Sequence, residues 1–417
     1  MNREHTFSYG KIAVIGSGFL ALMLVWTIYN TFMPLILGDY IESSAIRGAI
    51  MGIDNLLAVL LIPVIGAWSD RVKSPLGQRL PFIAVGMPLA AITFALLPFV
   101  SGIGLFILLT IDIVFLLAMT IYRAPVISLM PDHTPPTNRS TANGVVNFMG
   151  GVGAIIALFI LSPLFDVDRL FPFVIGGCIL FVAFILLYLV IDRNPPFTEN
   201  TAGDQEETQA LKTLKDGIKN LFLKENRGKL FIFLAIFLYF IGYTGVEALF
   251  SIWATEQLGL TGGEAGVTLG FFSLSFVLFA IPAGLLGTRF GKKPLMLVGL
   301  IFLPILFAVI PFLEGLLFVR IVLFLAGIAW ACINVQAYAL VSDLGGTSKI
   351  GLYTGIYYLF SMSSAIIAPF LLGTMMDLFG KDSLFFTAAI TMVIAFLFLR
   401  AGKDRDANVV NNSTKSM

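Results

Sequence analysis

Residues 47–100 read RGAIMGIDNLLAVLLIPVIGAWSDRVKSPLGQRLPFIAVGMPLAAITFALLPFV. The segment contains two apolar stretches, 47–68 and 80–100, joined by a short basic connection. Each stretch has about the 20 residues that an α-helix needs to cross the hydrocarbon of a bilayer. Strands of a membrane barrel would instead alternate apolar and polar residues over about ten positions, and this segment shows no such alternation. It therefore predicts two membrane-spanning helices.

The same kind of stretch recurs along the whole chain. Hydrophobic residues make up 58% of the 417 positions and charged residues 12%, against about 45–50% and about 25% in a soluble domain. We therefore expect an all-α integral membrane protein in contact with the lipid bilayer. Hydropathy predicts transmembrane helices at 12–37, 47–68, 80–100, 103–130, 141–163, 170–191, 230–254, 264–287, 294–313, 316–341, 350–374 and 383–400.

The cations of the connections are distributed unevenly between the two sides. Because loops rich in Lys and Arg stay in the cytoplasm, we expect both termini to be cytoplasmic and the protein to lie in the cell membrane. The first stretch is too long for a signal-peptide core and should remain as a helix. The side assigned to the cytoplasm carries Arg71, Lys73, Arg79, Arg139, Lys212, Lys215, Lys219, Lys224, Arg227, Lys229, Arg289, Lys292, Lys293 and Lys349. The opposite side carries Arg47, Arg169, Arg320 and Lys381.

A long polar connection divides the chain into two sets of six helices. We expect a first bundle at 1–191, a cytoplasmic linker at 192–228, a second bundle at 229–400 and a cytoplasmic tail at 401–417. Within the linker, apolar residues at helical spacing are surrounded by lysines, which is typical either of an amphipathic helix on the inner leaflet or of a solvated linker helix. The apolar positions are Leu211, Leu214, Ile218, Leu221 and Phe222, and the lysines are Lys212, Lys215, Lys219 and Lys224.

The two halves contain related segments. Gly66-x-x-x-Asp70-Arg71 after the second stretch recurs as Gly284-x-x-x-Thr288-Arg289 after the eighth, 218 residues later. Asp132 and Gly144 are twelve residues apart, as are Asp343 and Gly355 in the second half. Two pseudo-symmetric six-helix bundles with a site near the bilayer midplane are typical of secondary transporters.

This pattern resembles the major facilitator superfamily along the whole chain. The segment from Asp54-Asn55 through Pro63-x-x-Gly66-x-x-Ser69-Asp70-Arg71 to Gly77-x-Arg79-x-Pro81-Phe82 also resembles the sucrose:proton symporter-like branch, near the glycoside-pentoside-hexuronide:cation symporters. The resemblance implies the major facilitator fold, proton coupling and a sugar substrate. It also implies linked roles for an acid and an arginine eleven residues apart in the fourth helix, here Asp112 and Arg123. In the second copy of the motif, Thr288 stands where the first copy has the acidic residue Asp70.

Asp112 lies about 14 Å from the outer end of its span, at about 1.5 Å per residue. Acids near the bilayer midplane are costly and often mark proton pathways, so Asp112 is either a proton-coupling residue or a permanently hydrogen-bonded acid. Arg123 lies on nearly the same helix face about 16 Å further along, so a substrate or a side chain of another helix should bridge part of the gap. Its guanidinium suits paired sugar hydroxyls or a carboxylate, or it extends to the inner interface.

Asp54 and Glu247 are further proton-coupling candidates within the spans. Asp54 can instead join the two halves as a gate residue, and Glu247 lies in the last third of its span, where water would stabilise it. We rank both below Asp112.

Amides and aromatic rings at helical spacing form a candidate substrate-binding set. A neutral polyol needs hydrogen-bonding partners for its hydroxyls and ring faces for its C–H surface, although the same side chains also pack helices together. With Arg123, the set comprises Trp26, Tyr29, Asn30, Asn143, Asn147, Tyr243, Trp330, Asn334 and Tyr338.

The repeated motif itself predicts a conformational latch at the cytoplasmic rim. Asp70 could accept bonds from arginines or helix N-termini of the other half in one state and lose them in the other. A basic connection that only sets topology is the alternative. The latch residues are Gly66, Asp70, Arg71, Arg79, Gly284 and Arg289.

Motifs for other kinds of chemistry are missing from the sequence. Cys178 and Cys332 both lie in apolar stretches, and the chain has only two histidines, His5 and His133. Neither a metal-ligand set nor a phosphate loop nor a nucleophilic triad is visible, so we expect no cofactor, no metal and no enzyme activity. The formal net charge of +1 favours no nucleic-acid partner.

Three functions fit these observations. We favour secondary active transport, with proton-coupled symport of a sugar or glycoside as the specific interpretation. An exporter of drugs or lipophilic compounds in exchange for protons is the alternative, favoured by 39 phenylalanines, and a non-transporting sensor is the third. We expect a monomer that binds a small solute and a coupling cation. The sequence leaves open which solute, the choice of proton or sodium, the direction of transport and the oligomeric state.

Overall fold

The computed structural model describes residues 8–72, 74–197, 215–345 and 350–402. Within these ranges, twelve helices are long and apolar enough to cross a membrane. This confirms the predicted all-α membrane architecture. Lys73, Lys212, Lys349 and most of the predicted tail lie outside the described residues.

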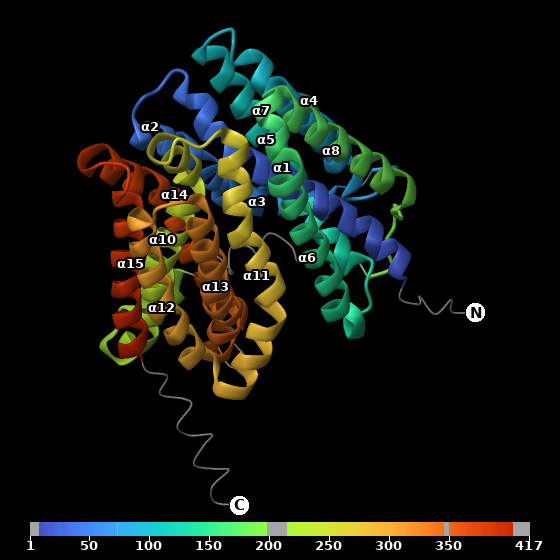
Figure 1. Cartoon of the computed structure of the whole chain (residues 1–417). Helices are drawn as coiled ribbons and strands as arrows, with labels where there is room; N and C mark the ends of the chain where they lie inside the picture. The colour runs from blue at the N-terminus through green and yellow to red at the C-terminus, as the bar shows by residue number, and fades with distance from the viewer. Residues whose placement is uncertain (1–7, 73, 198–214, 346–349, 403–417) are drawn as a thin grey trace, which may run out of the picture. The chain divides into compact units, whose positions relative to one another are not determined.

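The first compact unit contains most of the first half of the chain, residues 1–42, 53–201 and 254–270. In it α1 packs against α6 and α8, and α4 packs against α5 and α8, which Figure 1 shows as neighbouring blue and green ribbons. Its elements are α1 Tyr9–Gly38, α3 Ile53–Arg71, α4 Leu80–Val100, α5 Leu105–Asp132, η1 Pro136–Asn138, α6 Arg139–Ile155, η2 Ile156–Leu161, α7 Ser162–Val167 and α8 Leu170–Val190.

The second compact unit contains residues 43–52, 202–253 and 271–417. In it α12 packs against α13 and α15, and α14 packs against α13, α15 and the short helix α2. Its elements are α2 Ser44–Met51, η3 Lys224–Asn226, α10 Arg227–Gln257, α11 Gly262–Phe290, α12 Lys292–Val309, η4 Ile310–Phe312, α13 Leu316–Gly345, α14 Ile350–Phe379 and α15 Ser383–Ala401. By their contacts, the last residues of α10 and the first residues of α11, within 254–270, belong to the first unit.

Small residues allow the helices of each unit to pack closely. A Cβ atom on Gly86 of α4 would lie 2.8 Å from the Cβ of Tyr122 in α5. In the second unit, a Cβ on Gly299 of α12 would lie 2.7 Å from the carbonyl oxygen of Ala329 in α13. Such close approach of backbones is how membrane helices gain packing energy when water is not available to drive them together.

Two spans are interrupted. The second predicted span consists of α2 and α3, which are separated at Gly52. The fifth contains the six-residue π-helical segment η2, which ends two residues before Pro163. Proline has no backbone N–H to give to the preceding turn, and such local rearrangements keep the remaining backbone groups bonded inside a membrane.

The described end of the linker is partly helical. Residues 215–221 form a helix in which Leu221 is buried and Lys215 and Lys219 are exposed. A Cβ on Gly217 would meet the side chain of Leu352 at the start of α14, so one face of this helix packs on protein. Leu211, Lys212 and Leu214 lie outside the described residues.

Candidate functional site

Asp112 lies in the interior of the first unit. It belongs to α5 and is 1% exposed, and it lies near the hydroxyl of Tyr29 from α1, which has no hydrogen-bond partner among the described residues. The ring of Tyr29 packs on Phe115, one turn along α5, with ring centroids 5.2 Å apart. Oδ1 of Asp112 has no hydrogen-bond partner among the described residues. The structure therefore holds a carboxyl group in an apolar environment near one hydroxyl.

Arg123 lies further along α5 and is only partly exposed. Its guanidinium lies 5.6 Å from the centroid of the Trp26 ring in α1. Its charge also interacts with Asp54 of α3, and Oδ1 of Asp54 accepts a hydrogen bond of 2.7 Å from Asn55. The ring face of Trp26 orients the guanidinium, and the nearby Asp54 charge favours its position within the unit.

The gap between Asp112 and Arg123 is filled by α1. Trp26 and Tyr29 are three residues apart on this helix, so they share a face, and their ring centroids are 5.9 Å apart. Contacts thus run from Arg123 through Trp26 and Tyr29 to Asp112. The structure brings these four predicted residues and Asp54 together in one cluster, which we call the α1–α5 cluster.

The second unit contains a comparable acid and tyrosine. Glu247 of α10 lies near the hydroxyl of Tyr243, one turn earlier on the same helix. The ring of Tyr243 stacks on Trp330 of α13, with centroids 4.0 Å apart and an interplanar angle of 11°. Trp330 is buried and also contacts Tyr239. The aromatic stack fixes the position of Tyr243 and, through it, the surroundings of Glu247.

The remaining predicted substrate residues are more exposed. Asn143 and Asn147 are exposed on α6, and Asn147 donates to the Asn143 side chain at 2.9 Å. Tyr338 is 44% exposed on α13. Asn30 and Asn334 are half-buried. Their roles stay predictions.

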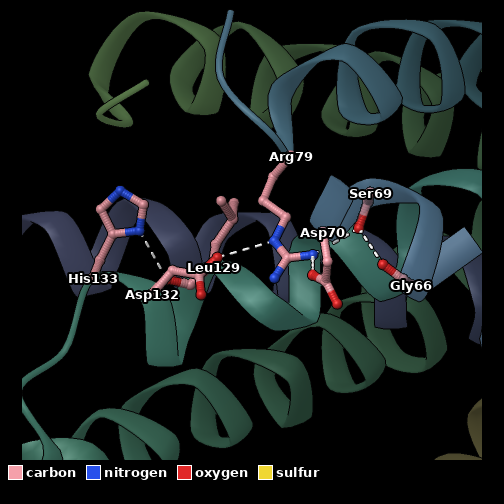
Figure 2. A network of polar contacts seen from close by, with 7 residues as sticks. All are labelled: Gly66, Ser69, Asp70, Arg79, Leu129, Asp132 and His133. Atoms are coloured by element: carbon pink, nitrogen blue, oxygen red, sulfur yellow. Dashed lines mark hydrogen bonds and ion pairs between the residues drawn. The ribbon is translucent and has the colours of Figure 1, made fainter. Parts of the chain in front are cut away.

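The residues of the predicted latch form a polar network at one end of the first unit (Figure 2). Nε of Arg79, the residue preceding α4, donates to Oδ2 of Asp132 at 3.0 Å. Its Nη1 donates to the Ser69 hydroxyl at 2.6 Å and pairs with Asp70. Ser69 in turn donates to the Gly66 carbonyl at 2.8 Å. In this structure Asp70 is thus bound by an arginine of its own half.

The start of the linker lies beside this network. The backbone N–H of Phe197 donates to the carbonyl oxygen of Asp132 at 3.2 Å. Gly77 has φ +83°, and a Cβ there would lie 1.9 Å from the carbonyl oxygen of Arg193. Only glycine combines this backbone conformation with so close an approach, which explains the glycine in the motif.

The second half contains the counterpart of the central ion pair. Nζ of Lys292, the first residue of α12, lies 2.5 Å from Oδ2 of Asp343. Sequence reasoning identified Asp132 and Asp343 only as markers of the repeat and did not assign them to a network. Their recurrence at the ends of corresponding spans was the available signal. Arg289 lies over the ring of Phe290, and Gly284 packs near Val335.

Within the described ranges, no three side chains of His, Cys, Asp or Glu come close enough together to hold a metal ion. Cys178 and Cys332 are both free thiols.

The long apolar helices and the repeated polar elements define a multi-pass membrane protein built from two related halves. The sequence matches the Major Facilitator Superfamily over residues 15–249 and 232–416. The chain belongs to this superfamily of membrane transporters, which confirms the broader resemblance. Its members carry small-molecule substrates across membranes.

Relatives with curated descriptions share the family but differ in what they are named for. An uncharacterized MFS-type transporter of Methanocaldococcus jannaschii is 27% identical over 169 residues, 39% of this chain and 42% of that protein. The class E tetracycline resistance protein of Escherichia coli is 22% identical over 64% of both chains. Multidrug resistance protein 2 of Bacillus subtilis is 21% identical over 99% of both. The match thus spans less than two thirds of the first two relatives.

Solved structures of transporters share the fold. A crystal structure of the nucleoside transporter NupG superposes with a TM-score of 0.75 and 14% identity, covering 94% of this chain and 100% of NupG. A bacterial homolog of the human lysosomal transporter Spinster gives a TM-score of 0.70 and 16% identity, covering 96% of both chains. At these identities the likeness shows the fold alone.

Proposed function

We propose that this chain is a proton-coupled secondary transporter of a sugar or glycoside that works by alternating access in the cell membrane, with both termini in the cytoplasm. The observation that carries the proposal is the α1–α5 cluster. Asp112 is buried beside Tyr29 and connected through Trp26 to the partly exposed Arg123. A group that binds a proton is thereby linked physically to a group that binds substrate.

The surroundings of Asp112 support a proton over a metal cation. Hard cations are bound in proteins by several oxygen ligands, whereas a proton needs only one carboxylate. The Tyr29 hydroxyl lies near Asp112, and no metal-binding group of three His, Cys, Asp or Glu side chains occurs within the part of the chain that the structure describes. Asp54 and Glu247 are further coupling residues in this proposal.

The polar groups of the predicted substrate-binding set support a hydroxyl-rich substrate. Arg123 offers a fork of N–H donors and Trp26 an aromatic face, while Asn143, Asn147 and Tyr338 present amide and hydroxyl groups at exposed positions. The resemblance to the sucrose:proton symporter-like branch supplies the sugar.

Reconstituted protein tests the coupling role. In liposomes with an imposed pH gradient, we expect uptake of labelled disaccharides that an uncoupler abolishes. Asp112→Asn should remove the gradient-driven accumulation but leave substrate exchange less impaired, because exchange needs no net proton movement. Asp39→Asn is the matched control, since Asp39 forms an exposed ion pair with Arg169. Unchanged accumulation in Asp112→Asn would refute the coupling role.

An exporter is the second candidate. The relatives named for resistance to tetracycline and to multiple drugs favour it. Expression in a drug-sensitive bacterial host distinguishes the two. Increased resistance that disappears in Asp112→Asn, without sugar uptake, would support export.

We also propose that the polar network of Figure 2 is the latch of the transport cycle. Arg79 holds Asp70 and Asp132 in the described state, and Asp70 would have to leave Arg79 in order to bind a group of the other half in the opposite state. Gly66, Arg71, Gly284 and Arg289 complete this set.

A further inference from the structure

The start of helix α2 is capped by a residue of a helix distant in sequence. Oδ1 of Asp377 in α14 accepts a 2.9 Å bond from the backbone N–H of Ser44, and Oδ2 accepts one of 2.9 Å from Ala45. The Ser43 hydroxyl donates to Oδ2 at 2.6 Å. Asp377 thus satisfies free N–H groups of the first turn with a negative charge, where the helix dipole favours one. Lys381 contributes a 2.7 Å bond to the Ser44 hydroxyl.

The start of helix α11 is capped in the same way. Oδ1 of Asp166 in α7 accepts a 2.8 Å bond from the backbone N–H of Gly263, and Oδ2 accepts one of 2.7 Å from the Thr261 hydroxyl. Glu264 completes a local cap by accepting from the Thr261 N–H at 3.0 Å. A carboxylate near the end of one span again holds the first turn of another.

The two caps are copies of each other within the internal repeat. Asp377 follows Asp166 by 211 residues, the same offset that separates Asp132 and Asp343. Thr261 follows Ser43 by 218 residues, the offset of the repeated motif. Both partners of each contact therefore keep their register, as expected for an arrangement with a shared function in both halves.

Glycines bring the capped helices into close contact with the helices that cap them. In α2, a Cβ on Gly48 would lie 2.2 Å from the carbonyl oxygen of Pro369 in α14. In α11, a Cβ on Gly266 would lie 2.1 Å from the hydroxyl oxygen of Ser162 in α7. Gly266 follows Gly48 by 218 residues. The packing below each cap is thus repeated as well.

Each of the two capping contacts joins a helix start to an acid from the other half of the sequence. Ser43–Gly52 packs within the second unit although α3, which follows it, belongs to the first. Residues 254–270 pack within the first unit although the rest of α11 belongs to the second. When the halves of a transporter move, each of these two helix starts must either stay with its capping acid or leave it.

We propose that Asp166 and Asp377 are paired positioning residues of the transport cycle, each of which holds the start of another helix in the described state and releases it in the opposite state. The proposal rests on alternating access in the proposed function, and on neither the sugar nor the proton. Release exposes the free N–H groups to water, which replaces the carboxylate. The acids therefore bias the balance between the two states without touching substrate.

Cysteine accessibility in the full chain tests the proposal without a substrate. In a background of Cys178→Ser and Cys332→Ser, the reporters are Ser44→Cys in α2 and Ser162→Cys in α7, both 0% exposed as serines. N-ethylmaleimide labels each reporter only when its contact opens. We expect Asp377→Ala and Asp166→Ala each to speed labelling about tenfold, the effect of losing a helix cap. Asp→Asn variants, which keep one acceptor oxygen, should fall in between.

The matched control is Asp168→Ala. Oδ1 of Asp168 accepts from the backbone N–H of Leu170 at 2.9 Å, which caps α8 within its own connection, so its loss should leave both reporters unchanged. A conformational role predicts that either Ala variant accelerates both reporters, because one state change opens both contacts. Acceleration only at the mutated contact, or none at all in protein that remains monodisperse by size-exclusion chromatography, would overturn the proposal.

Discussion

Arg79 donates from Nε to the carboxylate of Asp132 at 3.0 Å, and this pair is almost completely buried, with side-chain exposures of 11% and 8%. The same arginine also holds Asp70 and Ser69. Breaking a buried pair costs about 3–5 kcal/mol when the remaining charge has no other partner, and the ion pair of Arg79 with Asp70 reduces this cost. We therefore predict that Asp132→Ala lowers the thermal unfolding temperature strongly, as measured in detergent.

The repeat provides the control for this prediction. Asp343, which pairs with Lys292, is 57% exposed, and exposed ion pairs contribute about 0–1 kcal/mol. Asp343→Ala should therefore change stability little. Equal losses in the two variants would show that burial does not decide the strength of these related pairs.

A second prediction concerns pH and His133, which follows the end of α5. Burial lowers the pKa of His133 below its usual value, and the nearby charges of Asp192, Asp132 and Lys11 modify it less. Nδ1 lies 2.9 Å from the carbonyl oxygen of Leu129 and therefore carries the hydrogen, whereas Nε2 has no partner among the described residues. The folded protein thus binds fewer protons at this site than the unfolded chain does.

Above the unfolded pKa of about 6.5, the burial of His133 therefore does not lower the free energy of unfolding. As the pH falls through that value, the free energy of unfolding decreases. His133→Gln keeps a donor for Leu129 and does not titrate. Between pH 7.5 and 5, we expect the wild-type unfolding temperature to fall more than that of His133→Gln, because only the wild type gains a proton at this site on unfolding. Parallel curves for the two proteins would contradict this assignment.

The spans could be predicted because their signal is local. About 20 apolar residues in a row suffice to identify a membrane helix, whatever the rest of the chain does. The spacing of Asp112 and Arg123 likewise predicts a shared helix face, and the structure places Trp26 and Tyr29 between them. That another helix would fill the gap could be inferred, but which residues would do so could not.

Contacts between helices carry much weaker sequence signals. Arg79 and Asp132 are 53 residues apart, and nothing local to either residue indicates the other. The caps by Asp166 and Asp377 lie at span ends, where sequence reasoning counted charges for topology and did not search for helix partners. The interruption at Gly52 is another such feature, because it depends on the close approach of Ile366, 2.8 Å from a Cβ placed there.

A third prediction uses the glycines that allow helix contact. Gly86→Ala would place its Cβ 2.8 Å from the Cβ of Tyr122 and 3.1 Å from the carbonyl oxygen of Ala118. Overpacking of this kind typically costs about 1–3 kcal/mol. The matched control is Gly144→Ala in α6, where nothing lies within 4 Å and alanine should stabilise the helix by about 0.5–1 kcal/mol. Thermal unfolding of the two variants should thus shift in opposite directions.

The last prediction concerns the orientation of Arg123. Its guanidinium lies over the Trp26 ring and interacts with the charge of Asp54, so the indole fixes where the N–H fork points. Trp26→Ala removes the ring, whereas Trp26→Phe keeps an aromatic face. A cation–π contact contributes about 0.5–2 kcal/mol, so we expect Trp26→Ala to weaken substrate binding by about 2- to 30-fold and Trp26→Phe to weaken it less.

Arg123→Lys, which keeps the charge but loses the planar fork, should weaken substrate binding as much as Trp26→Ala does. Substrate-induced thermal stabilisation across a panel of sugars measures all three variants against the wild type. If Trp26→Ala binds the stabilising sugar as tightly as the wild type while Arg123→Lys does not, the arginine is oriented by Asp54 and not by the indole.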